Sequence, residues 1–499
     1  MPDNNKLLIG GNGSATVYLD ASMANRHGMV AGATGTGKTV TLQILAENFS
    51  KIGVPVFLSD VKGDVSGIGK AAKPHPKIDE RIATIGIDDY QMSPNPVVFW
   101  DLFGKKGHPI RTTVSEIGPL LLSSLLELND IQTGIVYSCF KIADDEGMLI
   151  LDLKDLRSML TWMADNRANL KGEYGNISTA SIGAIQRGLL VLDEQGAEFL
   201  LGEPAIALAD LMSHDFSGRG VINILDASKL IQTSPKLYST FLLWLLSELF
   251  ETLPEIGDAD KPKFVMFFDE AHLLFDDAPR VLVKKIEQVV RLIRSKGVGI
   301  YFISQSPLDI PEEILGQLGL KIQHALRAFT PKDQKAVRIV ANTFRANPAI
   351  DTGQVITELG VGEALVSVLN TDGIPTQVEK ILIRPPESRI GPMDKIERTE
   401  QISRSPFKGR YDKPLDRESA YEMLIARAKQ GAAQEEQIER EEQAREQAER
   451  TAKTTERSKT RRSTRQTPTE AFVKSAARAI GSQLGRRMLR GIMGSIFKG

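Results

Sequence analysis

Eight residues near the N-terminus, 32–39, have the types and spacing needed to hold a phosphate group. They read Gly-Ala-Thr-Gly-Thr-Gly-Lys-Thr, the pattern G-x-x-x-x-G-K-T. The glycines leave room for backbone N–H groups to curl around a phosphate. Lys38 offers a positive charge to the β- and γ-phosphates of a nucleotide, and Thr39 offers a hydroxyl group to Mg²⁺. We therefore predict a nucleotide site at Gly32, Ala33, Thr34, Gly35, Thr36, Gly37, Lys38 and Thr39.

A second group of residues could supply the acidic groups that nucleotide hydrolysis needs. Asp269 and Glu270 directly follow the five apolar residues 264–268. At this position Asp269 would hold the Mg²⁺ shell, and Glu270 would orient or deprotonate the attacking water. Strands often end in surface acids, but the combination with a phosphate loop in one chain predicts a Walker B motif.

Polar residues at two further strand ends could complete the site. Gln305 follows the predicted strand 299–304, where it could sense the γ-phosphate or position water. Asp60, Lys62 and Asp64 follow another predicted strand and could reach the nucleotide. Each group has an ordinary explanation as well, since many strands end in polar residues and the acids around Lys62 could cap a surface turn.

A cation for the charge that develops on the γ-phosphate is the remaining component, and two arginines are candidates. Such cations commonly come from a neighbouring subunit. Arg294 ends a predicted helix just before Gly-Val-Gly at 297–299, and Arg327 lies in the run 324–329. Spacing does not choose between them, and either could be an ordinary surface arginine.

Alternating strand and helix patterns predict an α/β fold that would bring these residues to one edge of a mostly parallel sheet. Strand, loop, helix and strand over residues 28–60 open such a sheet, and ligands bind at the carboxyl ends of its strands. Two short strands around a Gly-Asn-Gly turn precede it. Further strands are predicted at 97–100 near the sheet edge, 221–225, 264–269, 299–304 and, closing the sheet, 363–369.

The chain divides by pattern into five segments. We expect residues 1–110 and 216–405 to form two halves of an ATPase core, the first with the phosphate loop and the second with the Walker B motif and sensor. Apolar residues three and four apart predict a helical insertion at 111–215. Within the charged extension 406–470, the first part of residues 431–470 could form a charged single helix and the second part a solvated linker. Residues 471–499 are predicted to form a basic amphipathic helix, with one face made by Val473, Ala477, Ile480, Leu484 and Met488.

Composition indicates a soluble globular protein. The chain has 499 residues, 41% of them hydrophobic and 25% charged, and its single cysteine, Cys139, rules out an internal disulfide. A reducing, cytoplasmic compartment is the natural expectation. The polar N-terminus lacks the apolar core of a signal peptide, and the longest apolar run, 241–246, is too short to span a bilayer.

Charge is distributed unevenly along the chain. Residues 451–499 contain twelve Lys and Arg against two Asp and Glu, a net charge of +10, so residues 1–450 carry −11 within the overall −1. An acidic body is unlike a general nucleic-acid binder. Any contact with DNA would therefore have to be local, in a pore loop or through the basic C-terminal segment.

Together these motifs resemble the HerA/FtsK class of P-loop ATPases. The resemblance rests on residues 32–39, the turn Asp-Val-Lys-Gly-Asp at 60–64, Phe-Asp-Glu-Ala-His at 268–272 and residues 299–306. Within this class, the phrases at 23–28, 293–299 and 325–334 are similar to those of bacterial HerA-like proteins that carry a helicase HerA-like C-terminal domain. The resemblance covers roughly residues 6–410.

The class implies a RecA-like core, a hexameric ring, ATP and Mg²⁺ bound between subunits, and double-stranded DNA moved through the central pore. Matched to the family pattern, Thr39 and Asp269 would hold Mg²⁺, and the catalytic residues would be Lys38 of Walker A, Glu270 of Walker B, the sensor Gln305 and the finger candidate Arg327. HerA proper has an N-terminal β-barrel that helps assemble the ring and recruit a nuclease, whereas fewer than thirty residues precede the P-loop strand here. The membrane spans and winged domain of FtsK proper are not expected either.

Two functions are compatible with these features. The leading hypothesis is an ATP-hydrolysing motor, a DNA translocase or helicase. The alternative is an ATP-dependent scaffold or switch that acts on a protein partner or at a membrane surface. The alternative draws on the acidic body and on segment 471–499, which could lie on anionic lipid, bind nucleic acid, pack between subunits or simply end the chain.

Overall fold

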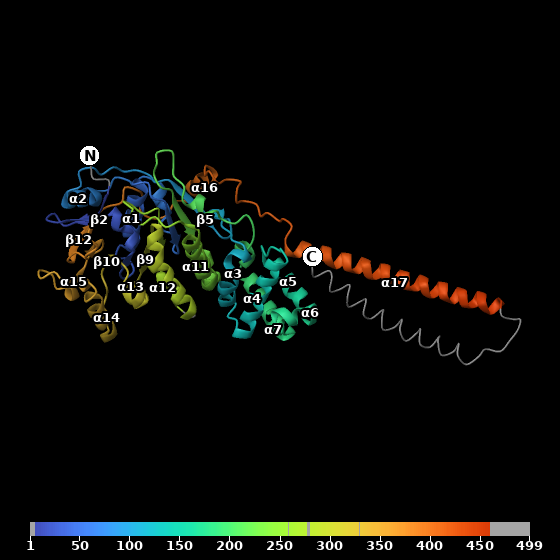
Figure 1. Cartoon of the computed structure of the whole chain (residues 1–499). Helices are drawn as coiled ribbons and strands as arrows, with labels where there is room; N and C mark the ends of the chain where they lie inside the picture. The colour runs from blue at the N-terminus through green and yellow to red at the C-terminus, as the bar shows by residue number, and fades with distance from the viewer. Residues whose placement is uncertain (1–4, 258, 277–279, 329, 460–499) are drawn as a thin grey trace. The chain divides into compact units, whose positions relative to one another are not determined.

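A computed structural model of the protein describes residues 5–257, 259–276, 280–328 and 330–459 (Figure 1). Contacts within the chain divide it into two units, Met1–Leu424 and Ile425–Gly499. The first unit contains every predicted site residue.

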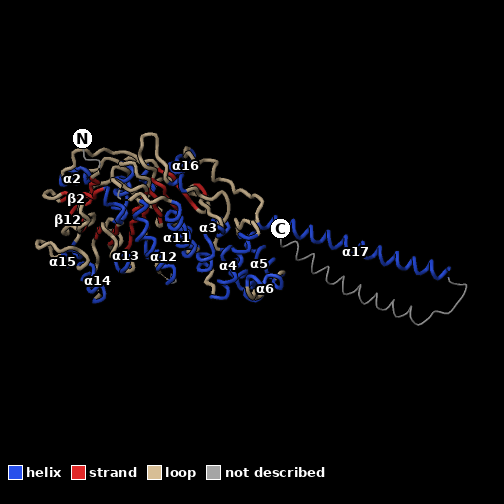
Figure 2. Tube along the Cα trace, in the orientation of Figure 1, coloured by secondary structure: helices blue, strands red, loops and turns tan. Residues whose placement is uncertain are grey.

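A sheet of twelve strands runs through the described part of the first unit (Figure 2). Its seven pairings from β10 to β6 are parallel, and the four pairings beyond β10 are antiparallel. The predicted α/β fold with a mostly parallel sheet is therefore confirmed. In spatial order the strands are β2 (Thr16–Asp20), β1 (Lys6–Gly11), β12 (Glu379–Ile383), β11 (Glu363–Ser367), β10 (Leu320–Gln323), β3 (Gly28–Ala31), β9 (Val298–Ser304), β8 (Phe264–Phe268), β4 (Val56–Asp60), β7 (Ile222–Asp226), β5 (Val97–Asp101) and β6 (His108–Pro109).

The central strands read as continuous apolar runs because helices cover both faces of the sheet. Every residue of β8 and β9 is buried. On one face Phe267 packs against Tyr301, with ring centroids 5.1 Å apart, in a cluster with helix α1 (Lys38–Lys51). On the other face Phe268 stacks on Phe302 at 5.8 Å, in a cluster with α11 (Pro235–Thr252) and α12 (Arg280–Ile293).

Residues between β6 and β7 are helical, as predicted from their spacing. Three of these helices begin with a capping box, at Thr113, Asn129 and Asp152. Their apolar faces join the core cluster that also contains α11. The predicted domain limits at 111 and 215 remain predictions. The helices are α3 (Val114–Leu125), α4 (Asp130–Asp145), α5 (Leu153–Asp165), α6 (Arg167–Tyr174), α7 (Thr179–Glu194), α8 (Ala197–Leu200) and α9 (Leu208–Leu211).

The prediction that the strand at 363–369 closes the sheet was wrong. That strand, β11, lies inside the sheet and pairs antiparallel with β10 and β12. The sheet continues through β12 and β1 to β2. β10 and β12 were missed because each is short and mixes polar with apolar residues, a weak signal beside the long apolar runs.

The rest of the first unit consists of short helices on the sheet and its edges, and the second unit begins within a long helix. The short helices are α2 (Pro76–Ile85), α10 (Ser228–Thr233), α13 (Glu312–Leu315), α14 (Pro331–Ala341), α15 (Thr352–Glu358) and α16 (Lys395–Ser403). The long helix α17 (Ala420–Lys459) is exposed from residue 426 to residue 451, as befits the charged helix predicted there. The predicted amphipathic helix 471–499 lies outside the described residues. Within the described ranges, we find no helix whose length and apolarity would let it cross a membrane.

Candidate nucleotide-binding site

The predicted phosphate loop connects β3 to α1 at the carboxyl edge of the central strands. Its Gly32, Gly35 and Gly37 all have positive φ, at 153°, 77° and 116°. Position 32 has no room for a side chain, because a Cβ on Gly32 would lie 2.5 Å from Cβ of His324. The local sequence thus folds into a loop that only glycine permits at these positions.

The end of β10 and the turn before β11 support this loop. The N–H of Ala33 donates to the carbonyl of Ala325 at 2.8 Å, and the N–H of Gly362 donates to the carbonyl of Thr36 at 3.0 Å. The buried ring of His324 links α1 to β11, because it hydrogen-bonds Thr41 Oγ1 at 2.8 Å and the carbonyl of Glu363 at 2.9 Å. Burial lowers the pKa of His324 to about 4, so its ring is neutral at pH 7. Sequence reasoning assigned His324 no such role.

Lys38 points into the loop. Its ammonium group donates to the carbonyl of Gly32 at 2.5 Å and to that of Ala33 at 3.1 Å. Burial, and secondarily the charge of Lys62, lowers the pKa of Lys38. An anion in the loop would offset that cost.

The two acidic residues of the turn after β4 have different partners. Asp60 is buried and accepts hydrogen bonds from the N–H groups of Gly63 at 2.7 Å and Val65 at 3.2 Å, so it caps the turn. Burial raises the pKa of Asp60 to about 6. Asp64 instead accepts a hydrogen bond from the hydroxyl group of Thr39 at 3.4 Å. Asp60 thus caps the turn, as one alternative expects, whereas contact of Lys62 or Asp64 with a nucleotide remains a prediction.

Asp269 and Glu270 lie at the end of β8, 9% and 7% exposed. Burial raises the pKa of Asp269 to about 7, against the opposing charge of Lys62. Burial would also raise the pKa of Glu270, but a hydrogen bond and the charge of Lys62 outweigh it and lower that pKa. The Lys62 Nζ to Glu270 Oε1 distance is 2.7 Å, and Gln305 Nε2 lies 3.5 Å from Oε2. Glu270 itself has left-handed backbone angles, φ 48° and ψ 53°, which cost a non-glycine residue energy and mark a constrained position.

The sheet brings most of the predicted site residues together. β9 lies between β3 and β8, and β8 lies beside β4, all parallel. The phosphate loop, the turn 60–64, Asp269 with Glu270, and Gln305 therefore share the carboxyl edge of four neighbouring strands.

The sequence of the chain is similar to that of a known protein family. Residues 5–499 match the model of the family described as helicase HerA-like C-terminal. The chain belongs to that family. It is 23% identical over 420 residues to a DNA double-strand break repair helicase HerA from Saccharolobus solfataricus, covering 80% of this chain and 73% of the relative. The corresponding helicase from Sulfolobus acidocaldarius is also 23% identical, over 379 residues, with 74% and 68% covered.

Solved structures similar to this HerA-like chain include a bacterial conjugative coupling protein TrwB and VirB4 of Thermoanaerobacter pseudethanolicus. Each has 16% sequence identity and a TM-score of 0.48 and covers 77% of this chain. The matched regions are 90% of the TrwB chain and 97% of the VirB4 chain.

The two arginine candidates of the HerA-like chain lie on opposite edges of the sheet. Arg327 follows β10 on the carboxyl edge, where its exposed side chain donates to the carbonyl of Thr357 at 3.2 Å. Arg294 lies between α12 and the start of β9, on the amino edge. There it lines a cavity of about 670 Å³ together with four other cations, Arg26, Arg291, Lys321 and Arg345. Sequence reasoning missed this group because its members come from segments far apart in the chain.

The side chains at the carboxyl edge fit Mg²⁺ with a nucleotide. Mg²⁺ is usually held by one or two protein ligands together with phosphate oxygens and water. Asp64 Oδ1 is buried without a hydrogen-bond partner, and the Thr39 hydroxyl lies next to that carboxylate. In the described part of the chain, no group of three or more His, Cys, Asp or Glu could hold a metal ion by itself. The donor set thus suits a cation that arrives with phosphates.

Proposed function

We propose that this HerA-like protein binds ATP with Mg²⁺ and hydrolyses it in an oligomer, and that the turnover moves double-stranded DNA. The observation that carries the proposal is the meeting of the phosphate loop with Asp269, Glu270 and Gln305 at one sheet edge. A phosphate loop alone would support binding only. The Glu270 carboxylate, held charged beside it by Lys62, supplies a base.

Each side chain has a distinct role in the proposed reaction. Lys38 and the loop N–H groups hold the β- and γ-phosphates, and Thr39 with Asp269 holds Mg²⁺. When bound, Mg²⁺ would neutralise charge on the phosphate oxygens. Glu270 orients or deprotonates the attacking water. Gln305 Nε2 lies 3.5 Å from Glu270 Oε2 and helps to orient the Glu270 carboxylate.

The separation of the two arginines supports the proposed oligomer. A ring of identical subunits joined head to tail brings two different faces into contact at every junction. If the carboxyl edge of one subunit meets the amino edge of the next, Arg294 and its neighbouring cations reach the phosphates in trans. In this arrangement Arg327 assists the nucleotide of its own subunit.

The proposal is tested by the ATPase rate of the full chain with and without double-stranded DNA, together with the mass of the oligomer. We expect a ring-sized mass and a rate that DNA stimulates, less so as salt rises. An oligomer whose turnover ignores DNA at all salt concentrations would contradict the DNA motor.

The observation that favours the alternative scaffold is the net charge of +10 on residues 451–499. A scaffold at a membrane would co-sediment with anionic vesicles and lose this property when residues 471–499 are removed. Its ATPase rate would not respond to DNA.

A further inference from the structure

A cavity of about 550 Å³ lies beside the phosphate loop, on the side away from Glu270. Its lining comes from the start of α1, from α2, from the turn before β11, and from the segment 383–390, which we call the strap. The side chains that make its apolar surface are Val40, Ile78, Val361, Pro385, Pro386 and Ile390. Two of these, Val361 and Ile390, are 70% and 55% exposed, so their apolar surface is accessible to a ligand.

The sheet order places this cavity where the nucleoside of a bound nucleotide would lie. β3, which leads into the loop, has β9 and β8 on one side and β10, β11 and β12 on the other. A triphosphate whose γ end faces Glu270 on β8 therefore points its other end toward the turns of β11 and β12. The cavity begins directly at the loop, since Gly37 and Val40 line it and a Cβ on Gly37 would lie 3.3 Å from Gly362 Cα.

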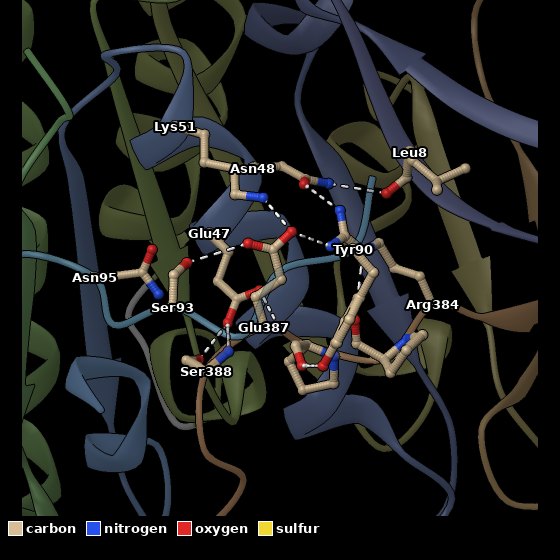
Figure 3. Close-up of polar contacts among 12 residues, drawn as sticks. Leu8, Glu47, Asn48, Lys51, Tyr90, Ser93, Asn95, Arg384, Glu387 and Ser388 are labelled. Carbon is tan, nitrogen blue, oxygen red and sulfur yellow. Dashed lines mark hydrogen bonds and ion pairs between the residues drawn. The ribbon is translucent and has the colours of Figure 1, made fainter. Parts of the chain in front are cut away.

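The strap is fixed to the helix that follows the phosphate loop (Figure 3). Glu47 of α1 accepts hydrogen bonds from the N–H groups of Glu387 at 3.0 Å and Ser388 at 2.9 Å, and from the Ser388 hydroxyl. Arg384 bonds both Asn48 of α1, at 3.2 Å, and Glu387, at 2.8 Å. All five side chains are buried, so this wall of the cavity is formed before any ligand binds.

Several polar groups of the wall are already bonded within the chain. Tyr90 donates to the carbonyl of Pro386 at 2.7 Å, and Gln43 donates to that of Arg389 at 3.1 Å. Arg81 donates to the carbonyls of Ile383, at 3.2 Å, and Val361, at 3.4 Å. Of the described residues that line the cavity, none is Asp or Glu. The described lining therefore offers no carboxylate that could accept a hydrogen bond from the amino group of a purine.

We propose that this cavity holds the base and sugar of the nucleotide by apolar contact, and that it accepts adenine and guanine nucleotides almost equally. This inference rests on the proposed function, because it needs a triphosphate in the loop. A pocket that reads a base by hydrogen bonds rejects the wrong base by about 10⁴-fold or more, whereas an apolar pocket discriminates weakly between bases of equal size.

The test measures dissociation constants of the full chain for Mg·ATP, Mg·GTP and Mg·tripolyphosphate by calorimetry. We expect ATP and GTP to bind within about tenfold of each other, and both to bind more tightly than tripolyphosphate. Ile390→Asn should weaken both nucleotides by roughly tenfold and leave tripolyphosphate unchanged. Ile396→Asn is the matched control, because Ile396 is 82% exposed on α16 and does not line the cavity.

Three results would overturn the inference. Equal binding of ATP and tripolyphosphate would show that nothing holds the nucleoside. A preference of more than about 10³-fold for one purine would show that hydrogen bonds read the base. An Ile390→Asn variant that binds both nucleotides as the unsubstituted chain does would remove the cavity from the site. Failure of all three ligands to bind would instead refute the proposed function itself.

Discussion

The carboxyl edge and the amino edge of the central sheet are built from different charges. At the carboxyl edge, Asp64, Asp269 and Glu270 lie with the cations Lys38 and Lys62, and Lys62 forms an ion pair with Glu270. At the amino edge, five cations line one cavity, and among the described residues no carboxylate lines it with them.

The two edges differ in how the charges of their cations are balanced. The carboxyl edge has carboxylates of its own, Asp269 and Glu270, whose charges act on Lys38 and Lys62. At the amino edge, Lys321 donates to the carbonyl of Thr343 at 3.0 Å, and burial lowers the pKa of Lys321. Arg345 likewise donates to the carbonyl of Pro375 at 3.0 Å. Backbone carbonyls satisfy donors but do not neutralise charge, so this edge suits an anion supplied by another molecule.

The largest effect is expected from a change at the carboxyl edge. Lys38→Ala removes the one ammonium group inside the loop described here, and we expect ATP turnover to fall by about 10³-fold or more. Steady-state phosphate release measures it, and Lys141→Ala on the exposed face of α4 is the control. Turnover near that of the unsubstituted chain would separate the loop from the chemistry.

At the amino edge, Arg294→Ala should reduce turnover by about 10³-fold while ATP still binds, because the cation acts only on the transition state in the neighbouring subunit. Arg327→Ala should have the smaller effect, since the proposal gives it only an assisting role. Binding is followed with a fluorescent ATP analogue and turnover by phosphate release. If Arg327→Ala is the more damaging of the two, the arginines have been assigned to the wrong edges.

Within the carboxyl edge, binding and hydrolysis should be separable. Glu270→Gln keeps the size of the side chain and leaves Asp269 in place, so ATP should bind while its hydrolysis falls on the order of 10²-fold or more. Retention of unhydrolysed ATP after gel filtration checks both points. Normal hydrolysis by this variant would refute the Walker B assignment.

The smallest change is expected from Lys62→Met, and it depends on pH. Lys62 keeps the pKa of Glu270 low against the effect of burial, so its loss should raise that pKa. Because the charged carboxylate is the active form, the acid limb of the kcat profile should move to higher pH. Activity should then fall more at acidic pH than at alkaline pH. An unchanged profile would show that Lys62 does not control Glu270.

Sequence reasoning succeeded where the signal is local. The phosphate loop is contiguous, and β8 and β9 are buried on both faces, so their apolar runs identify them. It failed where partners are distant in the chain. The pairing of Lys62 with Glu270, the support of the loop by His324 and the shared cavity of Arg26 with Arg345 all depend on strand order. β10 was missed although it supports the loop, because four residues carry too little pattern.

We propose that the carboxyl edge of one subunit and the amino edge of the next meet to form one site. The direct test mixes Lys38→Ala chains with Arg294→Ala chains under conditions that exchange subunits. Each variant alone should be nearly inactive. In a random one-to-one mixture, about a quarter of head-to-tail junctions pair an intact loop with an intact Arg294, so about a quarter of the original activity should return. Mixed oligomers that remain inactive would contradict the claim.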